Sequence, residues 1–278
     1  MKTLVTHIRP DLDALASSWL IRRYMPGWSE ARMAFVPAGK TLDNKGPDAD
    51  ADIIHVDTGR GNFDHHQFKA KLSATLIVFN YLNEHKHIPT NDIAALKRLA
   101  DFANIIDNFG EVDFPSPDAD VYDLSLGTLI DGVAMNESDD SKLASYSYIL
   151  LDAAASLLKK KVEAEQELPR GITFDSAMGK SLGLSTTNEE TVKLAQKKGY
   201  QLVVRKDPDR GFVRLKTPPN PAYDLTPIYN KLKEADPDAD WFLHSSLNML
   251  LNGSSKNPNV TPSKLQLNEI IDIVKNTR

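Results

Sequence analysis

Short β-forming segments alternate with longer helical patterns in the first half of the sequence, and this alternation constrains the fold more than any other feature. Segments typical of strands occur at 3–7, 31–36 and 52–57, and amphipathic helical patterns occur at 12–25 and 73–85. This order predicts parallel strands joined by crossover helices. We therefore expect an α/β domain whose ligands bind at the carboxyl ends of the strands.

The length of 278 residues suits two domains. A long helical pattern occupies about 141–167. After it, a hairpin pattern at 201–206 and 211–216 replaces the alternation of strands and helices in the first half. The predicted fold class is α/β, with a parallel-sheet domain joined by a long helix to a smaller α+β domain. The predicted boundaries are 1–140 for the catalytic domain, 141–190 for the bridging helix and linker, and 191–278 for the smaller, substrate-binding domain.

The absence of cysteine removes several chemistries at once. Without thiols there is no thiol nucleophile, disulfide, iron–sulfur cluster or zinc finger, so any metal must be held by His, Asp and Glu. Carboxylate-rich sites favour Mn, Mg or Fe. The formal net charge of -5 gives no general attraction to nucleic acid, so a phosphate-bearing ligand needs local bases or metal ions.

Acids and histidines gather where predicted strands end. His7 ends the first strand and is followed by Asp11 and Asp13, Asp57 ends the strand at 52–57, and the run Asp64-His65-His66 comes shortly after it. Carboxylates and imidazoles arranged in this way suit two-metal hydrolysis, in which a pair of divalent ions about 3.5–4 Å apart activates water and neutralises charge on a phosphoryl group.

In order and spacing, these motifs resemble the first three motifs of the DHH phosphoesterase superfamily, which includes RecJ-type exonucleases, oligoribonucleases, cyclic-dinucleotide phosphodiesterases and family II inorganic pyrophosphatases. The segments VDTGRGNFDHHQ and FLHSS are most similar to the Myg-type branch, that is, the melanocyte proliferating gene product and its relatives, described as metal-dependent 3′–5′ RNA exonucleases. The resemblance covers most of the chain in element order.

The resemblance implies two divalent metal ions, with manganese as the expected metal and Mg or Fe as alternatives. His7 and Asp11 would hold one ion, Asp13 and His65 would hold the other, and Asp57 would bridge them. The fourth motif of the superfamily is an Asp, for which Asp107 is the expected match and Asp101 the alternative. His66 would lie near the substrate phosphate, and Asp64 would orient His65.

The second half departs from the superfamily because it lacks the glycine-rich signature of the standard partner domain. Small residues, hydroxyls and bases stand there instead and suit close approach to a phosphate. The expected substrate-binding residues are His244, Ser245, Ser246, Asn252, Gly253, Ser254, Lys256 and Arg205. Arg205 belongs to a basic hairpin that suits either a nucleic-acid backbone or a solvated surface.

We therefore expect a metal-dependent phosphoesterase acting as a 3′–5′ exonuclease on short single-stranded RNA or DNA. The alternatives are a hydrolase of a small phosphate compound, such as pyrophosphate or a cyclic dinucleotide, and a non-catalytic nucleotide-binding protein. No run of about 18 apolar residues and no apolar signal core is present, so we expect a cytoplasmic protein without a membrane partner. The sequence leaves a homodimer open.

Overall fold

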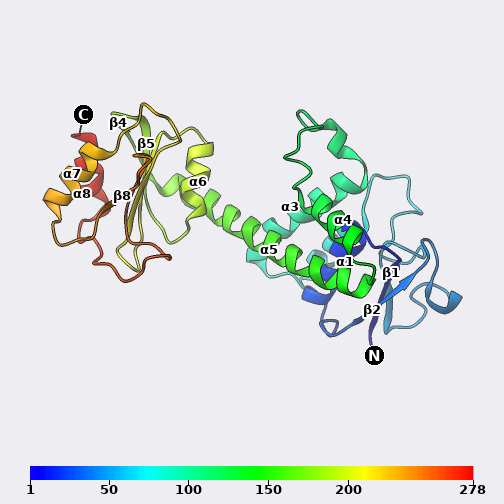
Figure 1. The fold of residues 1–278 in the computed structure, drawn as a ribbon. Helices are drawn as coiled ribbons and strands as arrows, with labels where there is room; N and C mark the ends of the chain where they lie inside the picture. The colour runs from blue at the N-terminus through cyan, green and yellow to red at the C-terminus, as the bar shows by residue number, and fades with distance from the viewer. Residues whose placement is uncertain (278) are drawn as a thin grey trace. The chain divides into compact units, whose positions relative to one another are not determined.

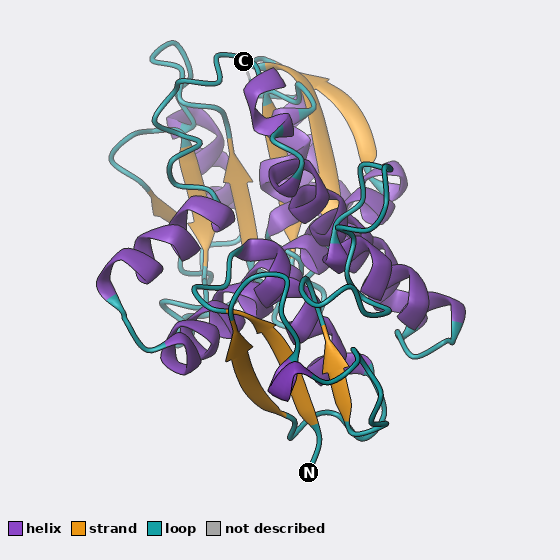
Figure 2. Ribbon diagram, turned by 90° about the vertical axis from the view of Figure 1, so that its right-hand side faces the viewer, coloured by secondary structure: helices purple, strands orange, loops and turns teal. Residues whose placement is uncertain are grey.

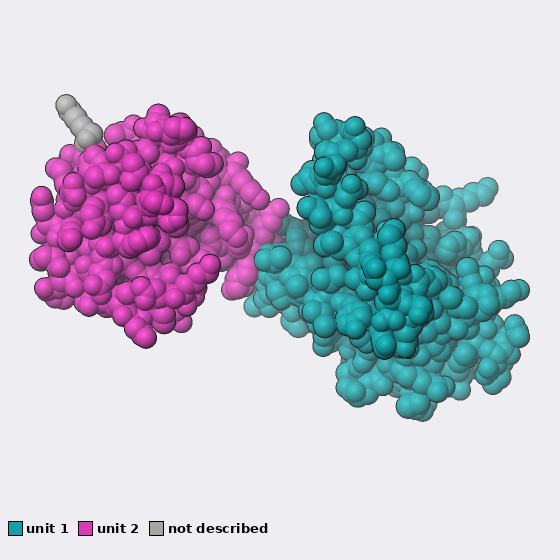
Figure 3. Space-filling view, viewed as in Figure 1, with its two compact units in different colours: residues 1–159 teal, residues 160–278 magenta. Residues whose placement is uncertain are grey.

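The computed structural model describes residues 1–277 and divides the chain into two compact units, residues 1–159 and 160–278 (Figures 1 and 3). The first unit contains β1 (Thr3–His7), α1 (Leu12–Tyr24), β2 (Arg32–Val36), the short 3-10 helix η1 (Leu42–Asn44), β3 (Ile53–His55), α2 (Ala74–Glu84), α3 (Thr90–Asp107), the 3-10 helix η2 (Gly110–Asp113), α4 (Leu126–Asn136) and most of α5 (Asp140–Glu167).

The first sheet is parallel, as the sequence predicts, with β1 between β2 and β3. Its central strand is buried over Thr3–Thr6, because helices and neighbouring strands cover it. The apolar face of α1 packs with α2, α3 and α5 around Trp19 and Leu143, each almost without exposed surface. This core holds the carboxyl ends of β1 and β3 at one edge of the sheet.

The second unit is built on a six-stranded mixed sheet of order β4-β5-β6-β7-β9-β8 (Figure 2). In this sheet β5 and β6 run parallel, and the other pairs are antiparallel. Its elements are the 3-10 helix η3 (Leu168–Arg170), β4 (Ile172–Ser176), β5 (Gly179–Ser185), α6 (Glu190–Lys197), β6 (Leu202–Lys206), β7 (Val213–Lys216), α7 (Thr226–Ala235), β8 (Phe242–Leu243), β9 (Met249–Asn252) and α8 (Leu267–Lys275).

The two faces of this sheet carry different helices. Val204, Leu215 and Leu250 belong to the core that contains α7 and α8, whereas Leu182 and Val203 belong to a smaller core with α6. The segment 141–190 is therefore not a helix and linker throughout, because its second half supplies β4, β5 and the start of α6. None of the helices in the described part of the chain is both long enough and apolar enough to cross a membrane.

Candidate metal centre

The loop between β1 and α1 supplies the first group of polar side chains. His7 ends β1, and Asp11 is the N-cap of α1, where its side chain accepts a hydrogen bond from the backbone N–H of Ala14 at 3.0 Å. Arg9 fixes this loop by donating from its guanidinium to the carbonyl of Glu137 at 2.6 Å. His7 and Asp11 thus sit at the carboxyl end of the central strand, where parallel sheets bind ligands.

Asp57 lies at the centre of the cluster. Its side chain is 3% exposed, and its two oxygens each contact an imidazole at 3.2 Å: Oδ2 faces His7 Nε2 and Oδ1 faces His65 Nε2. The backbone of Asp57 is left-handed, with φ 52°. A strained backbone that is held by its surroundings is a frequent feature of functional sites.

The third contribution comes from the end of α3. Asp107, the last residue of that helix, places Oδ2 3.7 Å from His65 Nε2, and Asp13 places Oδ2 3.8 Å from the same nitrogen. The alternative acid, Asp101, is half-buried and forms an ion pair with Lys97 on the same helix. The structure therefore brings Asp107 into the cluster, and not Asp101.

Asp13 also has a structural role in the first unit. It is 2% exposed, and its carboxylate accepts hydrogen bonds from the backbone N–H groups of Ala74 at 2.7 Å and Thr75 at 2.8 Å. These are the first two residues of α2, so the negative charge of Asp13 stands at the positive end of that helix. One carboxylate thus connects the start of α1, the start of α2 and the cluster.

The sequence suggested that Asp64 orients His65, and the structure shows that it does not. Its buried carboxylate instead accepts from the Nδ1 of His66 at 2.6 Å and from the backbone N–H of Arg60 at 2.6 Å. The imidazole of His66 is 59% exposed, so the rest of its ring faces the open side of the cluster. His65, which makes no hydrogen bond with Asp64, is oriented by Asp57.

The charges of the cluster shift the pKa values of its members. Burial alone would lower the pKa of His7, but its hydrogen bond with Asp57 and the charges of Asp11 and Asp57 outweigh this and raise it to about 9. The hydrogen bond with Asp57 is the main reason that the pKa of His65 is also about 9. Burial, followed by repulsion from Asp57 and Asp107, raises the pKa of Asp13 to about 7.

The same logic holds for Asp107, where burial raises the pKa to about 6 in spite of the favourable charge of His65. Crowded, partly buried carboxylates of this kind require a compensating positive charge, which protons or metal ions can supply. In each of three groups of side chains, the potential ligand atoms lie within 4.8 Å of one another. The donors are all imidazole nitrogens or carboxylate oxygens, a mixed set that suits divalent transition-metal ions such as Mn²⁺ or Fe²⁺. The groups are His7, Asp11 and Asp57; Asp13, His65 and Asp107; and Asp57, Asp64, His65 and His66.

A cavity of about 440 Å³ opens onto this cluster, and it and an adjoining cavity are lined by two residues that were not expected from the sequence. Arg60 lines it together with His7, Asp11 and Asp57, which supplies a guanidinium from the first unit itself. The adjoining cavity of about 240 Å³ adds a further acid, Asp131 of α4. The position of Arg60 between Asp57 and Asp64, within Gly59-Arg60-Gly61, was a signal that could have identified it.

The residues expected to bind substrate in the second unit do not form one surface. His244, Ser245 and Ser246 lie in the turn before β9, whereas Gly253, Ser254 and Lys256 follow the other end of that strand. Asn252 is fully buried and occupied, since its amide donates to the carbonyls of Asp240 and Thr261 and accepts from the N–H of Ser263. Among the expected residues, Arg205 and Ser254 line a common cavity.

The fold and the cluster define a mixed α/β protein with a carboxylate and imidazole centre that can hold metal ions. The family described as ChrB, C-terminal domain matches residues 4–158, more than half of the chain, and this chain belongs to that family. The match spans nearly the whole first unit and does not confirm the Myg-type branch expected from the sequence. No curated protein sequence matches this chain.

Solved structures with similarity to the chain include two RecJ structures and an exopolyphosphatase-related protein. RecJ of Thermus thermophilus in complex with Mg²⁺ is 12% identical with a TM-score of 0.34, over 99% of this chain and 49% of that one, so this chain spans about half its length. The exopolyphosphatase-related protein of Bacteroides fragilis is 12% identical with a TM-score of 0.27, and the similarity covers 98% of this chain and 89% of that protein. Exonuclease RecJ bound to manganese is 11% identical with a TM-score of 0.28, and the similarity covers 99% of this chain and 89% of that one.

Proposed function

We propose that the first unit is a metal-dependent phosphoesterase that uses two divalent ions, with manganese as the metal. The observation that carries the proposal is the position of Asp57, whose two carboxylate oxygens face two different donor groups. His7 and Asp11 stand on one side, and the second group, around His65, stands on the other. A carboxylate shared in this way is what a binuclear site needs between its ions.

The bound ions would supply a nucleophile from water and neutralise charge on the phosphoryl group. The side chains of the unit would do the rest. Arg60 would hold a phosphoryl oxygen, because its guanidinium lines the cavity and presents several donors. Asp64 would fix the ring of His66 through Nδ1, which leaves Nε2 of this exposed imidazole to hydrogen-bond the substrate.

For the substrate we propose a short single-stranded nucleic acid that is shortened from its 3′ end, as in the Myg-type branch that the motifs resemble. The net charge of -5 supports a short substrate, since a long polyanion would be repelled by the rest of the surface. The same site chemistry suits pyrophosphate or a cyclic dinucleotide, so these compounds belong in the first assay.

The test is hydrolysis of a 5′-labelled RNA oligomer by the full chain with manganese or with chelator, beside pyrophosphate and a cyclic dinucleotide. We expect a ladder of single-nucleotide steps that disappears with chelator. Asp57→Asn should abolish hydrolysis and lower the bound manganese, because Asn keeps the left-handed backbone but removes the charge. Asp43→Asn is the matched control, since Asp43 is also left-handed, with φ 55°, but lies outside the cluster.

The three substrates separate the outcomes. If only the cyclic dinucleotide is hydrolysed, the phosphoesterase proposal stands and the linear nucleic-acid substrate is wrong. If only pyrophosphate is hydrolysed, the two-metal hydrolase stands, but its substrate is a phosphoanhydride and not an ester. Failure of all three substrates with manganese bound would refute the phosphoesterase, as would full turnover by Asp57→Asn.

A further inference from the structure

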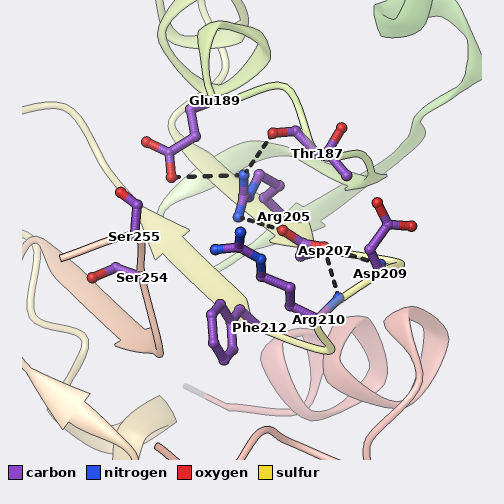
Figure 4. Close-up of a pocket in the computed structure, with 9 residues that line it drawn as sticks. All are labelled: Thr187, Glu189, Arg205, Asp207, Asp209, Arg210, Phe212, Ser254 and Ser255. Atoms are coloured by element: carbon purple, nitrogen blue, oxygen red, sulfur yellow. Dashed lines mark hydrogen bonds and ion pairs between the residues drawn. The ribbon is translucent and has the colours of Figure 1, made fainter. Parts of the chain in front are cut away.

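A second cavity with a different chemistry lies in the second unit. It has a volume of about 380 Å³ and is formed by the loop before α6, by β6, by the β6–β7 turn and by the loop after β9 (Figure 4). Three acids, two arginines, two serines, a threonine and a phenylalanine line it: Glu189, Asp207, Asp209, Arg205, Arg210, Ser254, Ser255, Thr187 and Phe212.

Arg205 is the unusual member of this cavity. It is 4% exposed, and its guanidinium has few close partners: Nη1 donates to the carbonyl of Thr187 at 3.4 Å, and the nearest carboxylate oxygens, of Glu189 and Asp207, lie at 3.7 and 3.6 Å. Within residues 1–277 its Nε has no hydrogen-bond partner. A guanidinium has five N–H donors, and leaving several of them unsatisfied in a buried place costs free energy.

A second arginine on the neighbouring strand shares the carboxylate closest to Arg205. Arg205 of β6 stands directly opposite Arg214 of β7, so both side chains project from the same face. Glu189 contacts both, at 2.9 Å from Arg214 and 3.7 Å from Arg205, and its closer partner is Arg214. The shared carboxylate therefore leaves most of the Arg205 donors available to an acceptor inside the cavity.

Further donors converge on the same space from neighbouring loops. Arg210 points into the cavity from the β6–β7 turn (Figure 4), which is held in shape because Asp207 accepts from the backbone N–H groups of Asp209 and Arg210 at 3.0 Å each. Ser254 and Ser255 bring two hydroxyls from the opposite wall. Their loop approaches closely because Gly253, with φ 78°, lies against the ring of Phe212, where a Cβ would come within 2.3 Å.

We propose that this cavity binds the phosphate group of a small phosphate monoester, a nucleotide or a sugar phosphate, independently of the metal centre of the first unit. Two guanidinium groups and two hydroxyls match the several acceptor oxygens of a phosphate better than the two of a carboxylate. The volume exceeds what a phosphate alone requires. Glu189 and Asp209 at the wall are suited to accept hydrogen bonds from sugar hydroxyls. The proposal goes beyond the phosphoesterase, since it requires neither metal nor turnover.

The experiment is isothermal titration calorimetry of the full chain in chelator with four probes: AMP, ribose 5-phosphate, inorganic phosphate and acetate. We expect AMP or ribose 5-phosphate to bind more tightly than phosphate, and acetate to show no binding. Comparison of the first two identifies whether the ligand is a nucleotide or a sugar phosphate. The wild type and Asp57→Asn should bind alike, which separates this result from any failure of the metal centre.

Variants locate the binding. Arg205→Gln and Arg210→Gln should each weaken binding of the best probe by about tenfold or more, because a charge-assisted hydrogen bond is lost. Arg170→Gln, an exposed arginine of the same unit that does not line the cavity, is the matched control. If Arg205→Gln fails to fold, the exposed positions Arg210 and Ser255, as Arg210→Gln and Ser255→Ala, still decide the matter. Absence of binding by every phosphate probe, or binding equal to the wild type in Arg210→Gln and Ser255→Ala, would overturn the proposal.

Discussion

Raising the pH should destabilise the metal-free first unit, because two histidines of its cluster hold protons that the unfolded chain releases. The pKa values of His7 and His65 are about 9 in the folded unit, against 6.5 for a histidine without partners. Between these values the folded state binds more protons than the unfolded state. The stability that the histidines contribute is therefore complete below pH 6.5 and is lost as the pH rises through about 9.

The size of the loss follows from the pKa values. Each extra proton that the folded state holds costs about 1.4 kcal/mol of unfolding free energy per pH unit as the pH rises. Over about 2.5 pH units the limit is about 3.4 kcal/mol for one histidine. Because water screens both side chains at the open cavity, we take half of the limit for the pair, which gives a loss of about 3 kcal/mol between pH 6.5 and 9. The raised pKa values of Asp13 and Asp107 act with the same sign at lower pH.

The measurement is urea unfolding of the full chain in chelator at several values between pH 6.5 and 9. Asp57→Asn should flatten the pH dependence, since it removes the partner that raises both pKa values. His85→Gln, an exposed histidine elsewhere in the unit, should leave it unchanged. Saturating manganese should also flatten it, because histidine binds metals in its deprotonated form. A wild-type stability that stays constant or increases over this interval would refute the reasoning.

Three further substitutions test separate parts of the site. In steady-state assays, Arg60→Gln should lower kcat/KM for the best phosphate substrate by about 10²-fold, whereas the exposed control Lys69→Gln should not lower it. Equal rates for Arg60→Gln and the wild type would exclude Arg60 from substrate binding. Gly59→Ala should cost about 1–2 kcal/mol in urea unfolding, because a Cβ at φ 74° would lie 2.8 Å from Thr41 Cγ2; an unchanged midpoint would contradict this. Asp13→Ala should lower the free energy of unfolding by about 2–4 kcal/mol and reduce hydrogen-exchange protection at the start of α2, because two N–H groups lose their acceptor. Unchanged hydrogen exchange there would show that these two hydrogen bonds are dispensable.

Much of the candidate metal centre could be predicted from the sequence, because parallel strands bring their last residues to one edge of the sheet. His7 ends β1 and Asp57 follows β3, and because these strands are neighbours the contact between the two side chains could be expected without knowledge of side-chain packing. The choice between Asp101 and Asp107 was harder. Six residues on a helix correspond to about 240° of rotation, so only one of them can face the cluster, and packing of α3 decides which.

Other parts depended on contacts that a pattern does not contain. Asp64 precedes both histidines, and its preference for His66 over His65 arises from a turn in which it also caps the N–H of Arg60. The strand β5 was missed because its sequence, GKSLGLS, contains two glycines and two serines and no β-branched or aromatic residue, so its composition does not indicate a strand. The helix α6 is amphipathic but only eight residues long, and a helix this short depends on packing against β5 and β6 for its stability.

The residue at position 57 must satisfy two independent requirements: a negative charge at the centre of the cluster and a left-handed backbone. Asp and Glu both supply the charge, whereas Asn, Asp and Gly adopt a φ of 52° far more readily than Glu does. Asp satisfies both, so a change that is conservative in charge fails on conformation, and one that is conservative in shape fails on charge. Asp11 is less restricted, because any residue adopts its extended backbone with φ -88° and its second role, the cap of α1, is also filled by Asn, Ser or Thr. Laboratory selection for a different metal should therefore find its substitutions at Asp11 and leave Asp57 in place.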